Sequence, residues 1–145
     1  MKVLFLDVDG VLTDGGLYFA ETGETTKRFN TLDGHGLKLL QSAGIQPVII
    51  TGRDSAALRY RLSELSVKTA FFAVEDKHKV AQDYLDQLHL NWAQVAAMGD
   101  DWPDFQMMKN AGLRICPAQG HQAVKEFAHL VTTLPGGHGA VREVC

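Results

Sequence analysis

The chain is poor in cysteine, with only Cys116 and Cys145 among its 145 residues. Two cysteines are too few for a disulfide framework or a thiolate zinc site, so we expect a fold held by a hydrophobic core in a reducing compartment. No apolar run approaches the roughly 20 residues that span a bilayer, and the first residues show no signal-peptide pattern. A cytoplasmic protein is therefore expected.

Positive charge is also scarce. Lysine and arginine together number 14 against 17 acidic residues, the net charge is -3, and no basic run occurs. This balance argues against a broad surface for nucleic acid. The six histidines include no pair at the spacing of zinc ligands. We expect a small-molecule partner, with neither nucleic acid nor membrane involved.

Short apolar runs alternate with segments of helical periodicity along the chain. The runs expected to form buried strands are 3–6, 48–50, 69–73, 95–98 and 113–115. Repeated strand–helix units predict a Rossmann-like, three-layer α/β fold, in which a parallel sheet carries helices on both faces. The chain is 46% hydrophobic and long enough for one compact domain, so a single domain is expected over residues 1–145.

One segment interrupts this alternation. Residues 17–20 and 25–29 flank a glycine-containing connection, which predicts a β-hairpin inserted at about residues 16–31. Towards the other end, a last helix is expected near 124–128. The glycine-rich segment 135–139 is expected to be a flexible loop.

Helix ends are expected at residues with capping side chains or with glycine. Asp33 and Asp76 would each cap the helix that follows, and Gly44 suits the left-handed end of the first of these helices. Asp101 could cap the helix that starts near Pro103, or it could join a metal site. The sequence leaves both roles open for Asp101.

Polar side chains gather where the expected strands end. They are Asp7 and Asp9 after the first strand, Thr51 after the second, Lys77 after the third, and Asp100, Asp101 and Asp104 after the fourth. Because the carboxyl ends of parallel strands share one edge of a sheet, we expect these side chains to converge. Facing carboxylates repel one another, and a hard cation with oxygen ligands, Mg²⁺, would neutralise them. Thr51 and Lys77, the latter at a helix N-terminus, would bind an anion, so the set predicts a phosphoryl-transfer site. Lys79 is an alternative to Lys77, although Lys77 lies closer to the strand end.

These motifs, in this order, resemble the haloacid dehalogenase superfamily of phosphotransferases. The matching elements are Asp7-Val8-Asp9-Gly10, Thr51-Gly52-Arg53, Lys77 and Gly99-Asp100-Asp101-Trp102-Pro103-Asp104. The resemblance implies that Asp7 is a nucleophile that forms an aspartyl-phosphate and that Asp9 is the general acid/base. It implies that Thr51 and Lys77 hold the phosphoryl oxygens. Its Mg²⁺ ligands would be Asp7, the backbone carbonyl of Asp9, Asp100, and Asp104 or Asp101.

The hairpin insertion is too short to form a cap domain over the site. Residues 7–16, 27–30 with 33–36, and 136–144 resemble the 3-deoxy-D-manno-octulosonate 8-phosphate phosphatase family. This resemblance implies a capless phosphatase of lipopolysaccharide biosynthesis that hydrolyses a sugar-acid phosphate monoester. It also implies a homotetramer assembled through the hairpins, with the glycine-rich tail near a neighbour's site.

The substrate is the least determined feature. Arg53 and Arg142 are expected to bind its carboxylate or phosphate, with Gly52 beside them, because arginine binds such groups in a bidentate manner. The nearest alternative is a nonulosonate (sialic acid or KDN) 9-phosphate phosphatase, whose relatives tend to carry Glu in place of Arg53. An oligomerisation module with a phosphatase fold is a further alternative. A receiver-like signalling domain ranks low, because Asp9 supplies the proton transfer that lets a phosphoryl group turn over.

Overall fold

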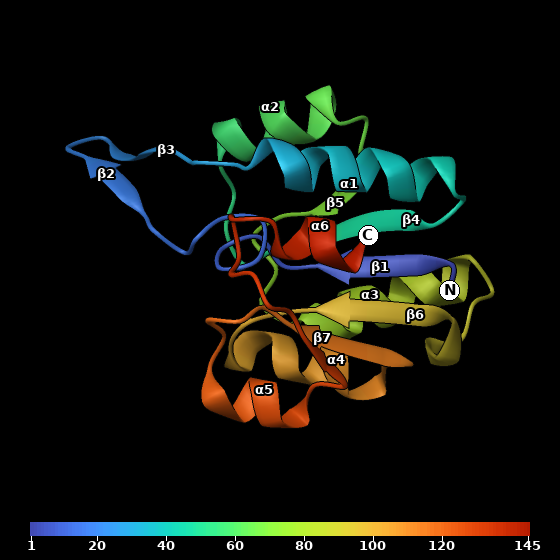
Figure 1. Ribbon diagram of the computed structural model, residues 1–145. Coiled ribbons are helices and arrows are strands. Elements are labelled where there is room, and N and C mark those ends of the chain that lie inside the picture. The colour runs from blue at the N-terminus through green and yellow to red at the C-terminus, as the bar shows by residue number, and fades with distance from the viewer.

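Six parallel strands form the centre of the molecule in the computed structural model, which describes all 145 residues (Figure 1). The strands are β1 (Val3–Leu6), β4 (Gln46–Ile50), β5 (Thr69–Phe71), β6 (Val95–Met98), β7 (Leu113–Cys116) and β8 (Leu130–Val131). Their order in the sheet is β5-β4-β1-β6-β7-β8. β1 lies between β4 and β6, with Phe5 level with Val48 and with Ala97. The carboxyl end of β1 is therefore flanked by strand ends on both sides.

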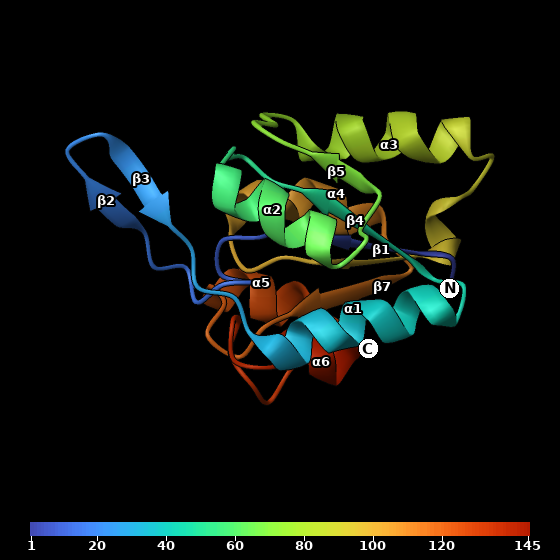
Figure 2. The ribbon, with the colours of Figure 1, turned by 90° about the horizontal axis from the view of Figure 1, so that it is seen from above.

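Helices cover both faces of this sheet (Figure 2). They are α1 (Thr31–Ser42), α2 (Ala56–Glu64), α3 (Lys77–Gln87), α4 (Phe105–Asn110), α5 (Gln122–Phe127) and α6 (Ala140–Val144). Alternate residues of β1 serve two cores: Leu4 and Leu6 pack with α1, α2 and α6, whereas Val3 and Phe5 pack with α3, α4 and α5. The expected three-layer α/β fold is confirmed. None of the helices is long and apolar enough to cross a bilayer.

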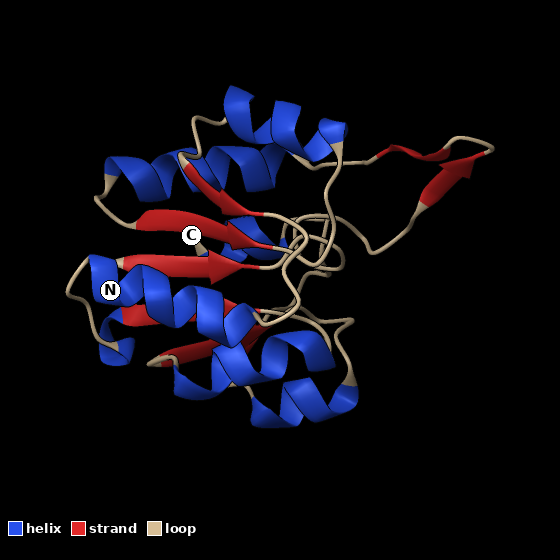
Figure 3. Ribbon diagram, turned by 180° about the vertical axis from the view of Figure 1, so that it is seen from behind, coloured by secondary structure: helices blue, strands red, loops and turns tan.

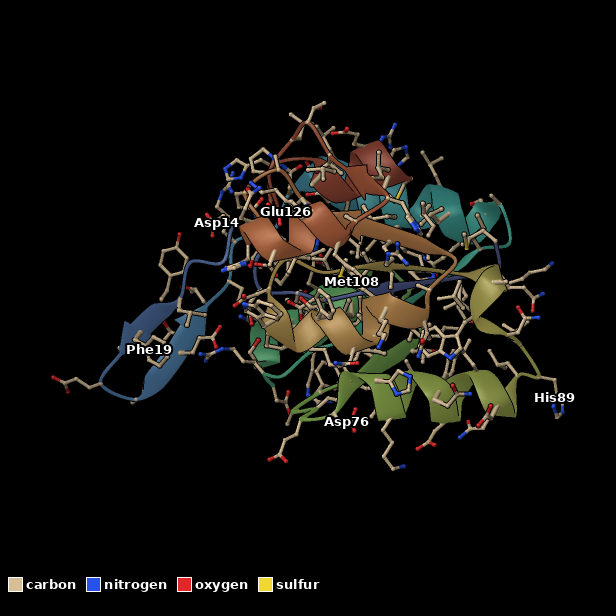
Figure 4. The ribbon with its side chains drawn as sticks, turned by 90° about the horizontal axis from the view of Figure 1, so that it is seen from below. Asp14, Phe19, Asp76, His89, Met108 and Glu126 are labelled. Atoms are coloured by element: carbon tan, nitrogen blue, oxygen red, sulfur yellow. The ribbon has the colours of Figure 1, made fainter.

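The hairpin stands apart from the sheet. Its strands β2 (Tyr18–Ala20) and β3 (Gly23–Thr26) pair only with each other, in antiparallel orientation. It projects from the side of the molecule at which the sheet strands end (Figures 1 and 3). Phe19, on the hairpin and away from the body of the molecule, is 63% exposed (Figure 4).

Helix caps agree with the sequence in part. Asp76 caps α3 by accepting a hydrogen bond from the Lys79 amide, and Gly44 has the left-handed conformation at φ +76°, as expected. The expectation for Asp33 is wrong. Asn30 caps α1, and Asp33 lies inside the helix with an exposed fraction of 1%. Its carboxylate binds the C-terminal segment instead.

The C-terminal segment is more ordered than the sequence indicates. The carboxylate of Asp33 accepts hydrogen bonds from the amides of Gly139 and Arg142, which places α6 against α1. The amide of Gly137 donates to the carbonyl of Val11, 3.1 Å away. The loop expected at 135–139 is present, and partners distant in the sequence hold its backbone.

Candidate active site

A polar cleft of about 510 Å³ opens where β1, β4 and β6 end. It is lined by Asp7, Asp9, Thr51, Gly52, Arg53, Val74, Lys77, Asp100, Asp101, Pro103 and Asp104. The structure thus brings together nearly all of the side chains that the sequence singles out. Parallel pairing in register explains the convergence, since Leu6 of β1 is level with Ile49 of β4 and Met98 of β6.

Lys77 is the central cation of the cleft. Its Nζ donates to Asp7 Oδ1 and to Asp104 Oδ1, each 2.6 Å away. Burial alone would lower the pKa of Lys77, but the two carboxylates outweigh this effect and raise it. The side chain, which is 5% exposed, is therefore charged at neutral pH. Lys79 pairs with Asp83 on an exposed face and does not line the cleft.

Three carboxylates crowd the same space. Asp7, Asp100 and Asp104 each place one oxygen within 4.8 Å of the others. Burial, followed by repulsion from Asp104, raises the pKa of Asp7 to about 7. Burial and repulsion from Asp7 raise the pKa of Asp100 to about 7. Lys77 alone therefore does not offset the negative charge of the cluster.

The cluster fits a hard divalent cation. All three side chains offer carboxylate oxygen, the donor that Mg²⁺ prefers, and the raised pKa values indicate charge that a cation would offset. Gly10 keeps the space beside Asp100 open, because a Cβ on Gly10 would lie 2.1 Å from Asp100 Oδ2. Gly10 also has φ +95°, which favours glycine.

The structure distinguishes the two roles left open for Asp101, which are helix capping and metal binding. Asp104 belongs to the carboxylate cluster, and its Oδ2 accepts from the amide of Asp100 at 3.0 Å. Asp101 accepts from the amide of Trp102 and caps the short 3₁₀ helix Trp102–Asp104. The geometry favours Asp104 over Asp101 as the additional acidic ligand.

Thr51 and Arg53 occupy the side of the cleft formed by the end of β4. Thr51 is 1% exposed, and its Oγ1 accepts from the Arg53 amide at 3.3 Å. The Arg53 side chain is 46% exposed and faces the cleft. Arg142 does not line the cleft, since it lies on α6, which packs against α1. A substrate contact by Arg142 stays a prediction that requires a second subunit.

Sequence reasoning missed two residue groups around the loop that carries Asp9. Lys27 Nζ lies 2.5 Å from Asp9 Oδ1 and 2.6 Å from Glu24 Oε1. On the other side, Gln119 Nε2 donates to the Gly10 carbonyl at 2.6 Å, and Gln119 Oε1 accepts from the Gly136 amide at 2.7 Å. Neither group could be found from sequence periodicity, because each pairs residues that only the tertiary fold brings together.

The fold and the cleft together define the class of haloacid dehalogenase-like hydrolases, and residues 74–143 match that family. Over its full length the chain is 39% identical to 3-deoxy-D-manno-octulosonate 8-phosphate phosphatase of Yersinia pestis and covers 78% of that protein. The crystal structure of the phosphatase of that name from Yersinia pestis superposes with a TM-score of 0.97, at 39% identity, covering 100% of this chain and 78% of that one. The corresponding protein of Moraxella catarrhalis, in complex with magnesium ion, phosphate ion and KDO, gives a TM-score of 0.96 at 36% identity, covering 100% and 83% of the two chains.

The chain belongs to the 3-deoxy-D-manno-octulosonate 8-phosphate phosphatase family of this class. The superfamily resemblance drawn from the four sequence motifs and the phosphatase-family resemblance drawn from residues 7–16, 27–30 with 33–36, and 136–144 are thereby confirmed.

Proposed function

We propose that the protein is a Mg²⁺-dependent phosphatase that hydrolyses 3-deoxy-D-manno-octulosonate 8-phosphate through an aspartyl-phosphate on Asp7. The observation that carries the proposal is the position of Lys77, 2.6 Å from both Asp7 and Asp104 at the floor of a polar cleft. Similarity to phosphatases named for this substrate, one of them in complex with magnesium, phosphate and KDO, supports the choice of sugar.

Asp7 acts as the nucleophile in this proposal. One of its carboxylate oxygens forms a bond to phosphorus while the bond from phosphorus to the sugar oxygen breaks. Lys77 and the Thr51 hydroxyl bind the phosphoryl oxygens and stabilise the charge that moves onto them. Because Asp7 is 7% exposed and follows the rigid strand β1, its carboxylate is held in one place before substrate arrives.

Asp9 carries the proton in both half-reactions. It protonates the sugar oxygen as that group leaves, and then removes a proton from the water that attacks the aspartyl-phosphate. The water oxygen bonds to phosphorus as the bond from phosphorus to the Asp7 oxygen breaks, which restores Asp7 and releases inorganic phosphate. This sequence of transfers is what separates a phosphatase from a receiver-like domain, which retains its phosphoryl group.

Mg²⁺ is the proposed cofactor. Asp7, Asp100 and Asp104 would hold it through carboxylate oxygens, with the backbone carbonyl of Asp9 as a further ligand. When bound, Mg²⁺ supplies positive charge to the phosphoryl oxygens and permits the carboxylates to be ionised together.

A homotetramer formed through the hairpins is also proposed. Leu17, Tyr18 and Phe19, at the start of the hairpin and in β2, are 38%, 47% and 63% exposed. An exposed apolar segment of this kind is expected to be covered by another subunit. Such assembly would compensate for the missing cap domain. A cytoplasmic location stays a prediction from the sequence.

The direct test is phosphate release in the presence of Mg²⁺. We expect turnover of 3-deoxy-D-manno-octulosonate 8-phosphate in preference to N-acetylneuraminate 9-phosphate. Asp7→Asn should lower kcat by about 10³-fold or more, because it removes the nucleophile. Asp86→Asn, on the exposed face of α3 where Asp86 accepts from Gln82, is the matched control and should retain full activity.

If the protein prefers N-acetylneuraminate 9-phosphate, the substrate assignment is wrong and the protein is a nonulosonate phosphatase. The proposed mechanism would be unaffected by that result. An Asp7→Asn protein that keeps wild-type activity would overturn the mechanism itself.

A further inference from the structure

The base of the hairpin reaches into the active site. Lys27 follows β3, and its side chain is 1% exposed, enclosed between Asp9 Oδ1 at 2.5 Å and Glu24 Oε1 at 2.6 Å. Asp9 comes from the loop after β1, and 18 residues separate it from Lys27 in the sequence. A contact within the fold therefore links the hairpin directly to the proton-carrying residue.

Two cations and two carboxylates complete this arrangement. Arg53 Nε lies 3.8 Å from Asp9 Oδ2, and Arg53 Nη1 lies 3.8 Å from Glu24 Oε2. The Glu24 side chain is 12% exposed, so Lys27 and Glu24 are shielded from water, whereas Arg53 is 46% exposed. The ion pair between Lys27 and Asp9 is short and buried, whereas the contact between Arg53 and Asp9 is longer and solvent-exposed. The Lys27 ion pair therefore constrains the Asp9 carboxylate more strongly.

The two carboxylates of Asp9 and Glu24 flank the Lys27 ammonium group at 2.5 and 2.6 Å. With three N–H donors, the ammonium group can hold Asp9 Oδ1 and leave Oδ2, whose contact with Arg53 is longer, to face a substrate.

We propose that Lys27, itself held by Glu24, is a positioning residue that fixes the Asp9 carboxylate in the orientation needed for proton transfer to the leaving group. The inference rests on the proposed phosphatase function and adds a role for the hairpin beyond assembly. The hairpin base would supply part of the geometry of the cleft in its own subunit.

The dependence of kcat/KM on the leaving group distinguishes a positioning role of Lys27 from a purely structural role. A sugar alkoxide must be protonated as it leaves, whereas p-nitrophenolate leaves without a proton, so only the first substrate needs Asp9 in the first half-reaction. Lys27→Met should lower kcat/KM for the sugar-acid phosphate by about 10–100-fold, a part of the 10²–10⁴-fold that general acids contribute. The value of kcat/KM for p-nitrophenyl phosphate should change by less than about threefold.

Three further variants sharpen the test. Lys27→Arg keeps a cation and should restore most of the lost activity on the sugar-acid phosphate. Glu24→Gln should show the same selectivity in weaker form, because it loosens Lys27 without removing it. Lys79→Met, at an exposed lysine paired with Asp83, is the matched control and should leave both substrates unaffected. Light scattering on every variant would establish whether the subunit number is retained.

Equal losses on the two substrates, or full activity in Lys27→Met, would overturn the positioning role. Loss of both activities together with dissociation of subunits would also overturn it, in favour of assembly alone. A wild-type protein that hydrolyses neither substrate would contradict the proposed function as well, so the two failures are distinguishable.

Discussion

Asp7 and Asp100 show at the scale of single residues why the cleft needs a cation. Both carboxyl groups lie in a buried cluster, and burial raises the pKa of each from its usual value of 3.8 to about 7. A folded state with raised carboxyl pKa values binds protons more tightly than the unfolded state. The stability from this source is complete below the unfolded pKa of 3.8 and is lost as the pH rises through about 7.

Mg²⁺ binding should therefore depend on pH in a defined direction. Protons compete for the same oxygens, so affinity should be about 10–100-fold weaker at about pH 6 than at about pH 8. Isothermal titration at the two pH values measures this ratio, and thermal melting should show a larger gain in Tm from Mg²⁺ at the higher pH. Stronger binding at the lower pH would contradict the assignment of Asp7 and Asp100 as ligands.

A site residue can be predicted from the sequence where its position relative to a strand or helix end decides its placement, and not where a tertiary contact decides it. Asp7, Thr51, Lys77 and Asp100 could be placed from sequence because each begins a helix or lies within two residues of a strand end. Lys27 could not, because only the tertiary fold brings its side chain beside Asp9. The positions of these residues are observed in the fold, whereas their catalytic roles stay predictions.

Secondary-structure elements were predictable where the local sequence decides them. β1 and β6 were placed at their observed bounds because apolar runs define them. β5 ends two residues earlier than expected, and Ala73 beyond it has a positive φ of 52°. β8 and α6 were missed, since each is short and depends on tertiary partners such as the buried Asp33.

The loop after β1 is held by a clamp formed by Gln119. Its amide group bridges the Gly10 carbonyl at 2.6 Å and the Gly136 amide at 2.7 Å, while a Cβ on Gly136 would lie only 1.9 Å from that carbonyl. The C-terminal segment and the catalytic loop are therefore packed backbone to backbone. Loss of the clamp would affect both segments.

Gln119→Ala should lower the free energy of unfolding by about 1–3 kcal/mol, because it leaves two backbone groups without their partners. Urea denaturation measures the effect. Gln122→Ala, whose side chain pairs with Glu126 on an exposed helix face, is the control and should change the free energy of unfolding by less than about 0.5 kcal/mol. Equal stability of the two variants would show that the clamp contributes nothing.

The whole molecule combines a buried catalytic cleft with an exposed apolar hairpin. Strand β2 of the hairpin carries Phe19, which lies away from the body of the molecule (Figure 4). Lys27, which follows β3, lies beside Asp9. Subunit assembly and catalysis would then both depend on this one small element.

Phe19→Glu should dissociate the proposed tetramer, because a charge on this exposed part of β2 cannot be buried between subunits at low cost. Light scattering at micromolar concentration measures the subunit number. Tyr60→Glu, at a side chain on α2 that is 72% exposed, is the matched control and should leave assembly unchanged. A wild-type chain that is monomeric would remove the hairpin-mediated assembly.

The most direct test of covalent catalysis uses Asp9→Asn with p-nitrophenyl phosphate and Mg²⁺. Nitrophenolate leaves without the general acid, but the intermediate then lacks the base that activates water. We predict a stoichiometric burst of nitrophenolate, and mass spectrometry of the quenched protein should find one added phosphoryl group on the peptide that contains Asp7. A burst with the phosphoryl group on another residue, or turnover with no burst and no modified Asp7, would contradict the aspartyl-phosphate mechanism.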